Sequence, residues 1–123
     1  MLFEQGSHTL MTLVHPLPPP LVDRIAQRFR VLGEPMRIRL LDLLRDGESS
    51  VHELTSSLDT TQQNVSKHLA VLHTEGIVSR RRDGTRVLYA IADESVFEIC
   101  EQVCGGLRRQ TSELEQLLAG ASR

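Results

Sequence analysis

Apolar residues recur three or four positions apart along most of this chain, which is the spacing of one face of an α-helix. The stretches 21–32, 35–45, 51–58 and 61–74 have this spacing, and so does a longer stretch from Asp93 to about residue 118. Between residues 77 and 91, two short runs flank Asp83-Gly84, a dipeptide that favours a two-residue hairpin turn. The pattern predicts a mainly α-helical fold with one small β-hairpin.

Capping residues mark the ends of these predicted helices. Pro20 suits the first position of the first helix, and Gly33 suits its end. Ser50 and Glu53 have the identity and spacing of a capping box, which predicts that the third helix begins at residue 51. The fourth helix follows only three residues after the third one ends, with Thr61 among its capping candidates.

The chain has 123 residues, which fits a single domain. Four of the five residues 16–20 are proline, and such a run cannot continue a helix. We therefore expect residues 1–17 to form a flexible arm and residues 18–120 to form the folded domain.

The net charge of −2 is unevenly distributed. Residues 60–90 carry 5 Lys or Arg and 2 Asp or Glu, a balance of +3. Residues 1–59 carry 6 Lys or Arg and 8 Asp or Glu, and residues 91–123 carry 3 Lys or Arg and 6 Asp or Glu. Both flanks are therefore acidic. Because salt screens charges beyond about 10 Å, a local basic surface matters more for phosphate binding than the sum over the chain.

Two helices joined by a tight turn and followed by a basic hairpin are the layout of a winged helix-turn-helix, a fold that binds DNA. The helix over 61–74 would be the recognition helix. Its amide side chains suit adenine edges, and the hairpin arginines suit phosphates. The predicted DNA-binding residues are Thr61, Gln62, Gln63, Asn64, Ser66, Lys67, Arg81, Arg82 and Arg86. The alternative is a polar helix face and a charged hairpin that only face solvent.

Three segments, 29–41, 63–78 and 81–89, resemble the ArsR/SmtB family of bacterial repressors, and the similarity extends over residues 21–118. The resemblance implies a homodimer built from the first and last helices. It also implies binding to a double-stranded DNA operator near a promoter and release when an inducer binds. The apolar stripes of these two helices independently favour a two-fold dimer, which would match an inverted repeat in the DNA.

The resemblance suggests two kinds of metal site, and neither fits this sequence. The arsenic-type site would place cysteines in the third helix, but residues 51–54 contain none. The zinc-type site would need an Asp-x-His in the final helix with a His eleven residues beyond, whereas this chain has Asp93-Glu94-Ser95 and then Gly106.

Cys100 and Cys104 are four residues apart and therefore project from one face of the final helix. Such a pair can bind one soft metal or metalloid ion, with further ligands from the other subunit or from His8 or His15. Two other interpretations stay open: the thiols respond to oxidation, or they are small buried residues of the dimer interface. Gly105-Gly106 follows directly and allows either close helix approach or bending.

Other functional classes have less support. The sequence has no Gly-rich phosphate loop, nucleophile-base pair or usefully spaced carboxylate pair, so an enzyme is not expected and no cofactor is required. A protein-interaction module, or a regulator with purely structural cysteines, is the alternative to an inducible repressor. No run is apolar enough for a membrane span and residues 1–20 do not have the pattern of a signal peptide, so we expect a cytoplasmic protein with reduced thiols.

Overall fold

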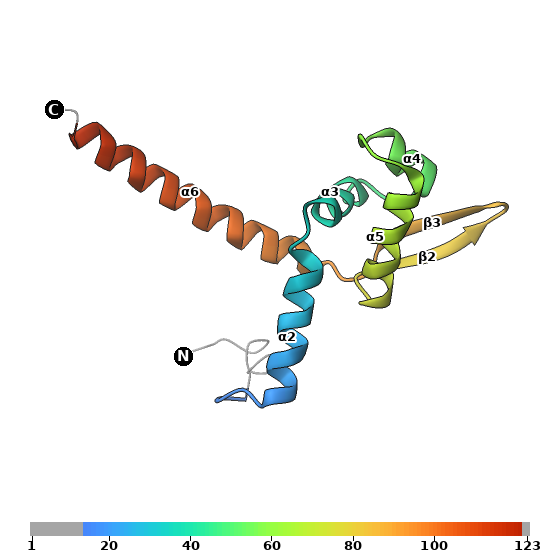
Figure 1. The fold of residues 1–123 in the computed structure, drawn as a ribbon, viewed down its shortest axis with the longest axis horizontal. Coiled ribbons are helices and arrows are strands. Elements are labelled where there is room, and N and C mark those ends of the chain that lie inside the picture. The colour runs from blue at the N-terminus through green and yellow to red at the C-terminus, as the bar shows by residue number, and fades with distance from the viewer. Residues whose placement is uncertain (1–13, 122–123) are drawn as a thin grey trace.

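A computed structural model describes residues 14–121 of the chain. A compact cluster of short helices lies beside a small sheet, and one long helix projects away from it (Figure 1). The elements are α2 (Pro19–Leu32), α3 (Pro35–Leu44), β1 (Ser49–Ser50), α4 (Val51–Ser56), α5 (Gln62–Thr74), β2 (Val78–Asp83), β3 (Arg86–Ile91) and α6 (Ser95–Ala121). The mainly helical winged helix-turn-helix fold is confirmed. The division into an arm at 1–17 and a domain at 18–120 stays a prediction, because residues 1–13 lie outside the described part.

The helix starts follow the capping chemistry of the sequence. The backbone N–H of Glu53 donates to the Ser50 hydroxyl at 3.1 Å and the Ser50 N–H donates to the Glu53 carboxylate at 2.9 Å, so the capping box of α4 is confirmed. Thr61 caps α5 by accepting from the Asn64 N–H at 3.1 Å. A cap that the sequence analysis did not name is Glu34, whose carboxylate accepts from the N–H of Met36 at the start of α3.

The sheet differs from the prediction in two respects. It has three antiparallel strands in the order β1-β3-β2, because Ser49 and Ser50 pair with Tyr89 and Leu88. A two-residue strand has no alternation of its own and gives no pattern to read. The hairpin turn also lies one residue later than expected: Asp83 pairs with Arg86, and Gly84, at φ +65°, takes the first turn position, where positive φ is required.

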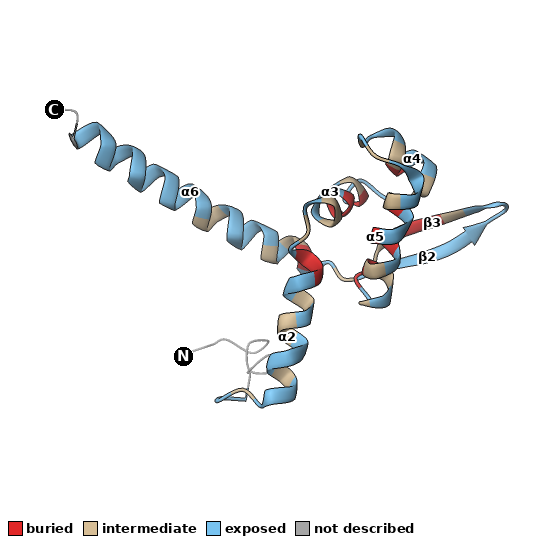
Figure 2. Cartoon of the chain, in the orientation of Figure 1, coloured by how far each residue is buried: buried red, intermediate tan, exposed pale blue. Residues whose placement is uncertain are grey.

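The hydrophobic core lies where α3, α4 and α5 meet the sheet, together with the first turn of α6 and the last of α2. Its largest fully buried side chains are Leu40, Leu54, Val65, Leu69, Leu72, Ile77, Val78 and Val96. Figure 2 shows the buried positions gathered in this cluster. One chain therefore completes this core by itself.

The helix α6 extends well beyond the core and is exposed over most of its length (Figure 2). Its 27 residues run through Gly105-Gly106 without a break. A Cβ atom added at either glycine would meet only the guanidinium end of Arg109, at 3.5 and 3.8 Å. Nothing in the described chain thus requires glycine at these positions. No helix among residues 14–121 is both long and apolar enough to cross a membrane.

Candidate nucleic-acid interface

The amino-terminal turn of α5 is a capped and internally bonded structure. In addition to the Thr61 cap, the side-chain amide of Asn64 donates to the Thr60 hydroxyl at 2.9 Å, and Asn64 is half-buried. The amide of Gln62 lies 3.2 Å from Nδ1 of His52 in α4. Two of the predicted base-reading amides are therefore also used to join α5 to the turn and to α4.

Three predicted side chains at the front of α5 are free for an external partner. Gln63, Ser66 and Lys67 are exposed, and their side chains form no hydrogen bond or ion pair within the described residues. They lie three and four positions apart and so share one helix face. This face points away from the core, since Val65 and Leu69 on the opposite face are fully buried.

Behind this face, α5 is joined to α3 through a buried histidine. Nδ1 of His68 lies 3.1 Å from a guanidinium nitrogen of Arg37 and 3.5 Å from the Glu34 carboxylate. Arg37 also donates to the Val31 carbonyl at the end of α2 at 2.6 Å. Burial lowers the pKa of His68 from its ordinary value, and the nearby Glu34 carboxylate opposes this shift only in part. The neutral ring then accepts a hydrogen bond from Arg37.

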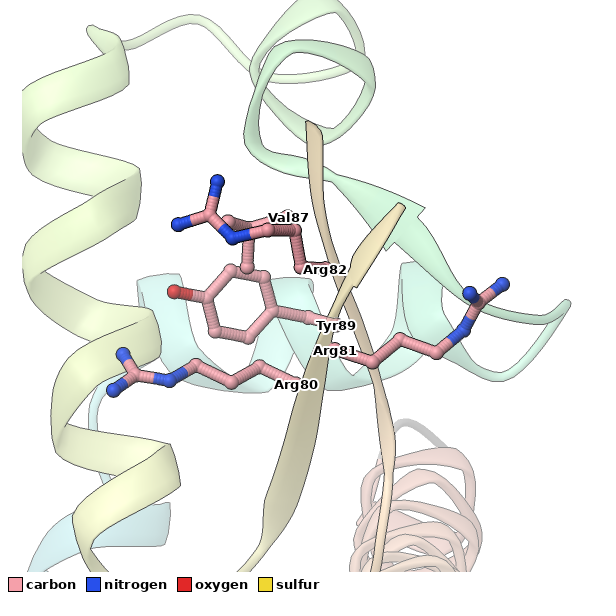
Figure 3. A pocket seen from close by; sticks show the side chains of 5 residues that line it. All are labelled: Arg80, Arg81, Arg82, Val87 and Tyr89. Atoms are coloured by element: carbon pink, nitrogen blue, oxygen red, sulfur yellow. The ribbon is translucent and has the colours of Figure 1, made fainter. Parts of the chain in front are cut away.

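The three consecutive arginines of β2 point to alternate sides of the hairpin. Arg80 and Arg82 pair with Tyr89 and Val87 across the sheet and share their face. Figure 3 shows these four side chains on the side of the hairpin that faces the α5 ribbon, and Arg81 on the opposite side. The period of two along a strand thus separates Arg81 from its neighbours.

The face with Arg80 and Arg82 forms a basic cleft next to α5. Its volume is about 410 Å³, and Figure 3 shows the Tyr89 ring between the two arginine side chains. Neither Arg80 nor Arg82 has an acidic partner within the described residues. Their charges are therefore available to an anion.

The other two hairpin arginines are paired with carboxylates. Arg81 forms a two-pronged ion pair with Glu48, and the hydrogen bond from Arg81 lowers the pKa of this carboxyl. Arg86 lies 3.9 Å from Glu53 and 3.7 Å from Asp83. Of the predicted hairpin residues, Arg81 and Arg82 line the basic cleft, but the guanidinium group of Arg81 points to the opposite side of the hairpin (Figure 3). Arg80 was not among the predicted DNA-binding residues, although strand alternation places it on the same face as Arg82.

The predicted thiol pair lies far from this surface, on α6. Cys100 and Cys104 are both exposed, and neither forms a disulfide bond. Both line an apolar cleft of about 390 Å³ between α2, α3 and α6, together with Phe29, Leu32, Ile38, Val103 and Leu107. Among residues 14–121, no group of three or more His, Cys, Asp or Glu side chains is arranged to hold a metal ion. His8, a suggested further ligand, lies outside the described residues.

Comparisons with known proteins all indicate the same family. The model of "Bacterial regulatory protein, arsR family" matches residues 34–80. The HTH-type transcriptional regulator Rv0081 of Mycobacterium tuberculosis is 39% identical over 84% of this chain and 95% of its own length. The repressor SmtB of the same organism is 38% identical over 68% of the chain, and the match spans only 64% of the length of SmtB.

Solved structures agree with this family in fold. The crystal structure of Rv0081 is similar with a TM-score of 0.70 and 36% identity, over 78% of this chain and 97% of that one. The homodimeric winged helix-turn-helix DNA-binding domain of Mb0332 from Mycobacterium bovis, solved by NMR, is similar with a TM-score of 0.68 and 27% identity. This match covers 81% of this chain and 95% of the Mb0332 fragment.

Proposed function

The chain belongs to the arsR family of bacterial regulatory proteins, and from this premise we propose that it is a homodimeric transcriptional repressor that binds operator DNA through α5 and the β2–β3 hairpin. The observation that carries the proposal is the position of the unpaired cations. Arg80 and Arg82 lie on the side of the hairpin that faces α5 (Figure 3), and Gln63 and Lys67 of α5 have no hydrogen-bond or ion-pair partner within the described residues. A free amide and free cations on these two neighbouring elements suit base edges and phosphates together.

Each part of this surface has its own role in the proposal. Gln63 reads a base edge in the major groove, where a bidentate amide pairs with adenine. Ser66 and Lys67 contact the flanking bases or phosphates. The uncapped N–H groups and the dipole at the start of α5 favour a phosphate near Thr61 and Gln62. Arg80 and Arg82 bind phosphates on the hairpin side, whereas Arg81 and Arg86 must first weaken their internal ion pairs.

The partner of this chain is, in our proposal, a second copy of itself, as in Mb0332. Apolar side chains stay 46–71% exposed on α2, α3 and α6, which is a large area for a chain that is alone in water. They are Val22, Phe29, Ile38, Val103, Leu107, Leu114, Leu117 and Leu118. On α6 these residues form one stripe, which also contains the two cysteines. A two-fold dimer through α2 and α6 covers this stripe and presents two α5 helices to an inverted repeat.

The inducer site that we propose is the thiol pair Cys100 and Cys104. Both thiols are accessible in the single chain and line a cleft that the dimer would enclose. Thiolates prefer soft ions, so trivalent arsenic or cadmium suits the pair, with further ligands from the second copy. A mild oxidant is the other candidate signal. Cysteines that only fill space in the interface would leave DNA binding unchanged when both are replaced by serine.

The experiment that tests the function is DNA binding by the purified dimer. Sequences selected from a random duplex pool should contain an inverted repeat, and affinity for them should fall steeply with salt. Addition of trivalent arsenic, cadmium, zinc or a mild oxidant should release the DNA from the wild type but not from the Cys100→Ser/Cys104→Ser variant. A protein-interaction module would select no sequence and show no steep salt dependence.

A further inference from the structure

One arginine of α2 joins three helices that are far apart in the sequence. Nε of Arg28 donates to the Glu75 carboxylate at 3.2 Å, and another nitrogen of its guanidinium group donates to the Asp93 carboxylate at 2.9 Å. A third nitrogen donates to the backbone carbonyl of Glu75 at 3.3 Å. All three nitrogens of this one guanidinium group are therefore used in what we call the Arg28 bridge, formed by Arg28, Glu75 and Asp93.

The two partners of Arg28 are the end of one helix and the start of another. Glu75 is the carboxyl-terminal cap of α5, where unpaired carbonyls favour a cation. Asp93 precedes α6 and accepts from the Ser95 backbone N–H at 3.0 Å and from the Ser95 hydroxyl at 2.6 Å. These bonds, with that from Arg28, hold the pKa of Asp93 below its usual range, so the carboxylate is charged at neutral pH. The bridge thus fixes the exit of α5 and the entry of α6 against α2.

Next to the bridge, α2 and α5 are separated by an open groove. Its volume is about 250 Å³, and its walls are Gln27, Val31, Ala70, Val71, Thr74 and Glu75. Side-chain packing therefore does not fill the space between these two helices along this side. Where helices pack closely, their side chains set the distance between them. Here the distance between α2 and α5 depends more strongly on the polar link at the end of the groove.

We propose that Arg28 is a positioning residue: through the bridge it sets the placement of the recognition helix α5 relative to α2 and α6. This inference rests on the proposed function, in which α2 and α6 form the dimer and α5 reads the DNA. In such a dimer, the bridge on each subunit determines the distance and angle between the two α5 helices. Operator binding needs this distance to match one turn of DNA, whereas random DNA binding needs only a basic surface.

The chain offers a matched control on the same helix. Arg30 carries the same charge, but within the described residues its guanidinium group bonds only to the side chain of Gln27, in its own helix, at 2.9 and 3.3 Å. Replacement of either arginine by glutamine removes one positive charge from α2. Only the replacement of Arg28 removes the hydrogen bonds and ion pairs of the Arg28 bridge.

The test compares Arg28→Gln, Arg28→Lys and Arg30→Gln with the wild type. The DNA probes are the selected operator, versions of it with one base pair inserted or removed between the half-sites, and random duplex. We expect Arg28→Gln to lose about tenfold in operator affinity and less than twofold on random duplex. The penalty for altered spacing should be large for the wild type and for Arg30→Gln, and several-fold smaller for Arg28→Gln. Arg28→Lys, with one ammonium group for three acceptor atoms, should be intermediate.

The outcomes separate this inference from the proposed function. A wild type that does not prefer operator to random duplex overturns the proposed function itself. A wild type that prefers the operator, with an unchanged spacing penalty in both Arg28 variants, overturns the positioning role of Arg28. Thermal unfolding is measured in parallel, and equal losses on all DNA probes together with a lower melting temperature would also overturn it. If Arg28→Gln does not fold, the spacing penalty of Arg28→Lys decides.

Discussion

The two parts of this molecule differ in how much of their apolar surface a single chain buries. The inner part, made of α3, α4, α5 and the sheet, buries most of its apolar residues within a single copy, and Leu40, Val65 and Leu69 are fully inaccessible. The outer part, made of α2 and α6, has Phe29 57% exposed and Leu107 58% exposed. The proposed DNA-reading surface is therefore formed within a single chain, whereas the proposed dimer surface leaves its apolar side chains exposed in the single chain.

This difference determines what a mutation in each part should do. An isolated helix gains little stability from its backbone alone and depends on packing of its apolar face. The last two thirds of α6 have such a face but no packing partner among the described residues. We expect changes in the outer part to act on assembly and changes in the inner part to act on folding or on individual DNA contacts.

The largest effect should come from a charge in the outer part, such as Leu107→Glu. Because Leu107 is exposed in the single chain, the variant should fold, but a dimer would have to bury the carboxylate. We expect a monomer by sedimentation equilibrium. Operator affinity should fall by at least about a hundredfold, since the second half-site no longer adds avidity.

The control for this prediction is Gln116→Glu, which adds the same charge on the opposite side of α6, nine residues and two and a half turns further on. It should leave both the dimer and operator binding in place. A dimeric Leu107→Glu protein would contradict the comparison, because it would place the interface elsewhere.

A smaller effect is expected in the hairpin, where neighbouring arginines form an internal comparison. Arg80→Ala/Arg82→Ala should weaken binding to every DNA sequence and lower the salt slope by about 2, at about 0.9 per lost phosphate contact. Arg81→Ala should lower it by less, since Arg81 is paired with Glu48 on the other face. The measurement is affinity against salt concentration on random duplex. Equal slopes for the double variant and the wild type would place the basic cleft off the DNA.

The sequence carried enough information for the regular parts of this fold. Helical spacing and capping chemistry gave the helices, as the Ser50–Glu53 box shows, and the hairpin followed from its glycine. The strand β1 was missed because its two residues have no periodicity and form a strand only by pairing with Tyr89 and Leu88. Local patterns do not reveal such long-range pairing.

The candidate site was predicted less completely than the fold. The sequence pattern indicated the segments of the candidate surface but not the orientation of each hairpin side chain, which depends on the register of β2 against β3. It therefore named Arg81 and omitted Arg80, and it could not reveal that Glu48 pairs with Arg81 from 33 positions away. The Arg28 bridge was missed for the same reason, because its partners lie 47 and 65 positions away.

A base-reading residue of α5 should have a more selective effect. Gln63→Ala should cost about 1–3 kcal/mol on the operator and little on random duplex, which corresponds to one bidentate base contact. Asn64→Ala, in contrast, should lower the stability of the fold by about 1 kcal/mol, because it removes the hydrogen bond from Asn64 to the Thr60 hydroxyl. Affinities on both DNAs, with urea unfolding, separate the two roles. Equal losses on operator and random duplex for Gln63→Ala would contradict base reading.

The smallest effect should come from His68, within the completed core of the inner part. The pKa of His68 is lowered in the folded chain, so the unfolded chain takes up this proton first as the pH falls through the ordinary value of about 6.5. The free energy of unfolding should therefore decrease below pH 6.5 until the folded protein is protonated as well. Each full unit of lowering corresponds to about 1.4 kcal/mol. Urea unfolding between pH 8 and pH 5 should show this decrease in the wild type, and His68→Gln should show less of it while remaining a dimer. If the two proteins had the same pH dependence, His68 would be no more desolvated in the folded chain than in the unfolded one, and the inner part would be less completely closed than its packing indicates.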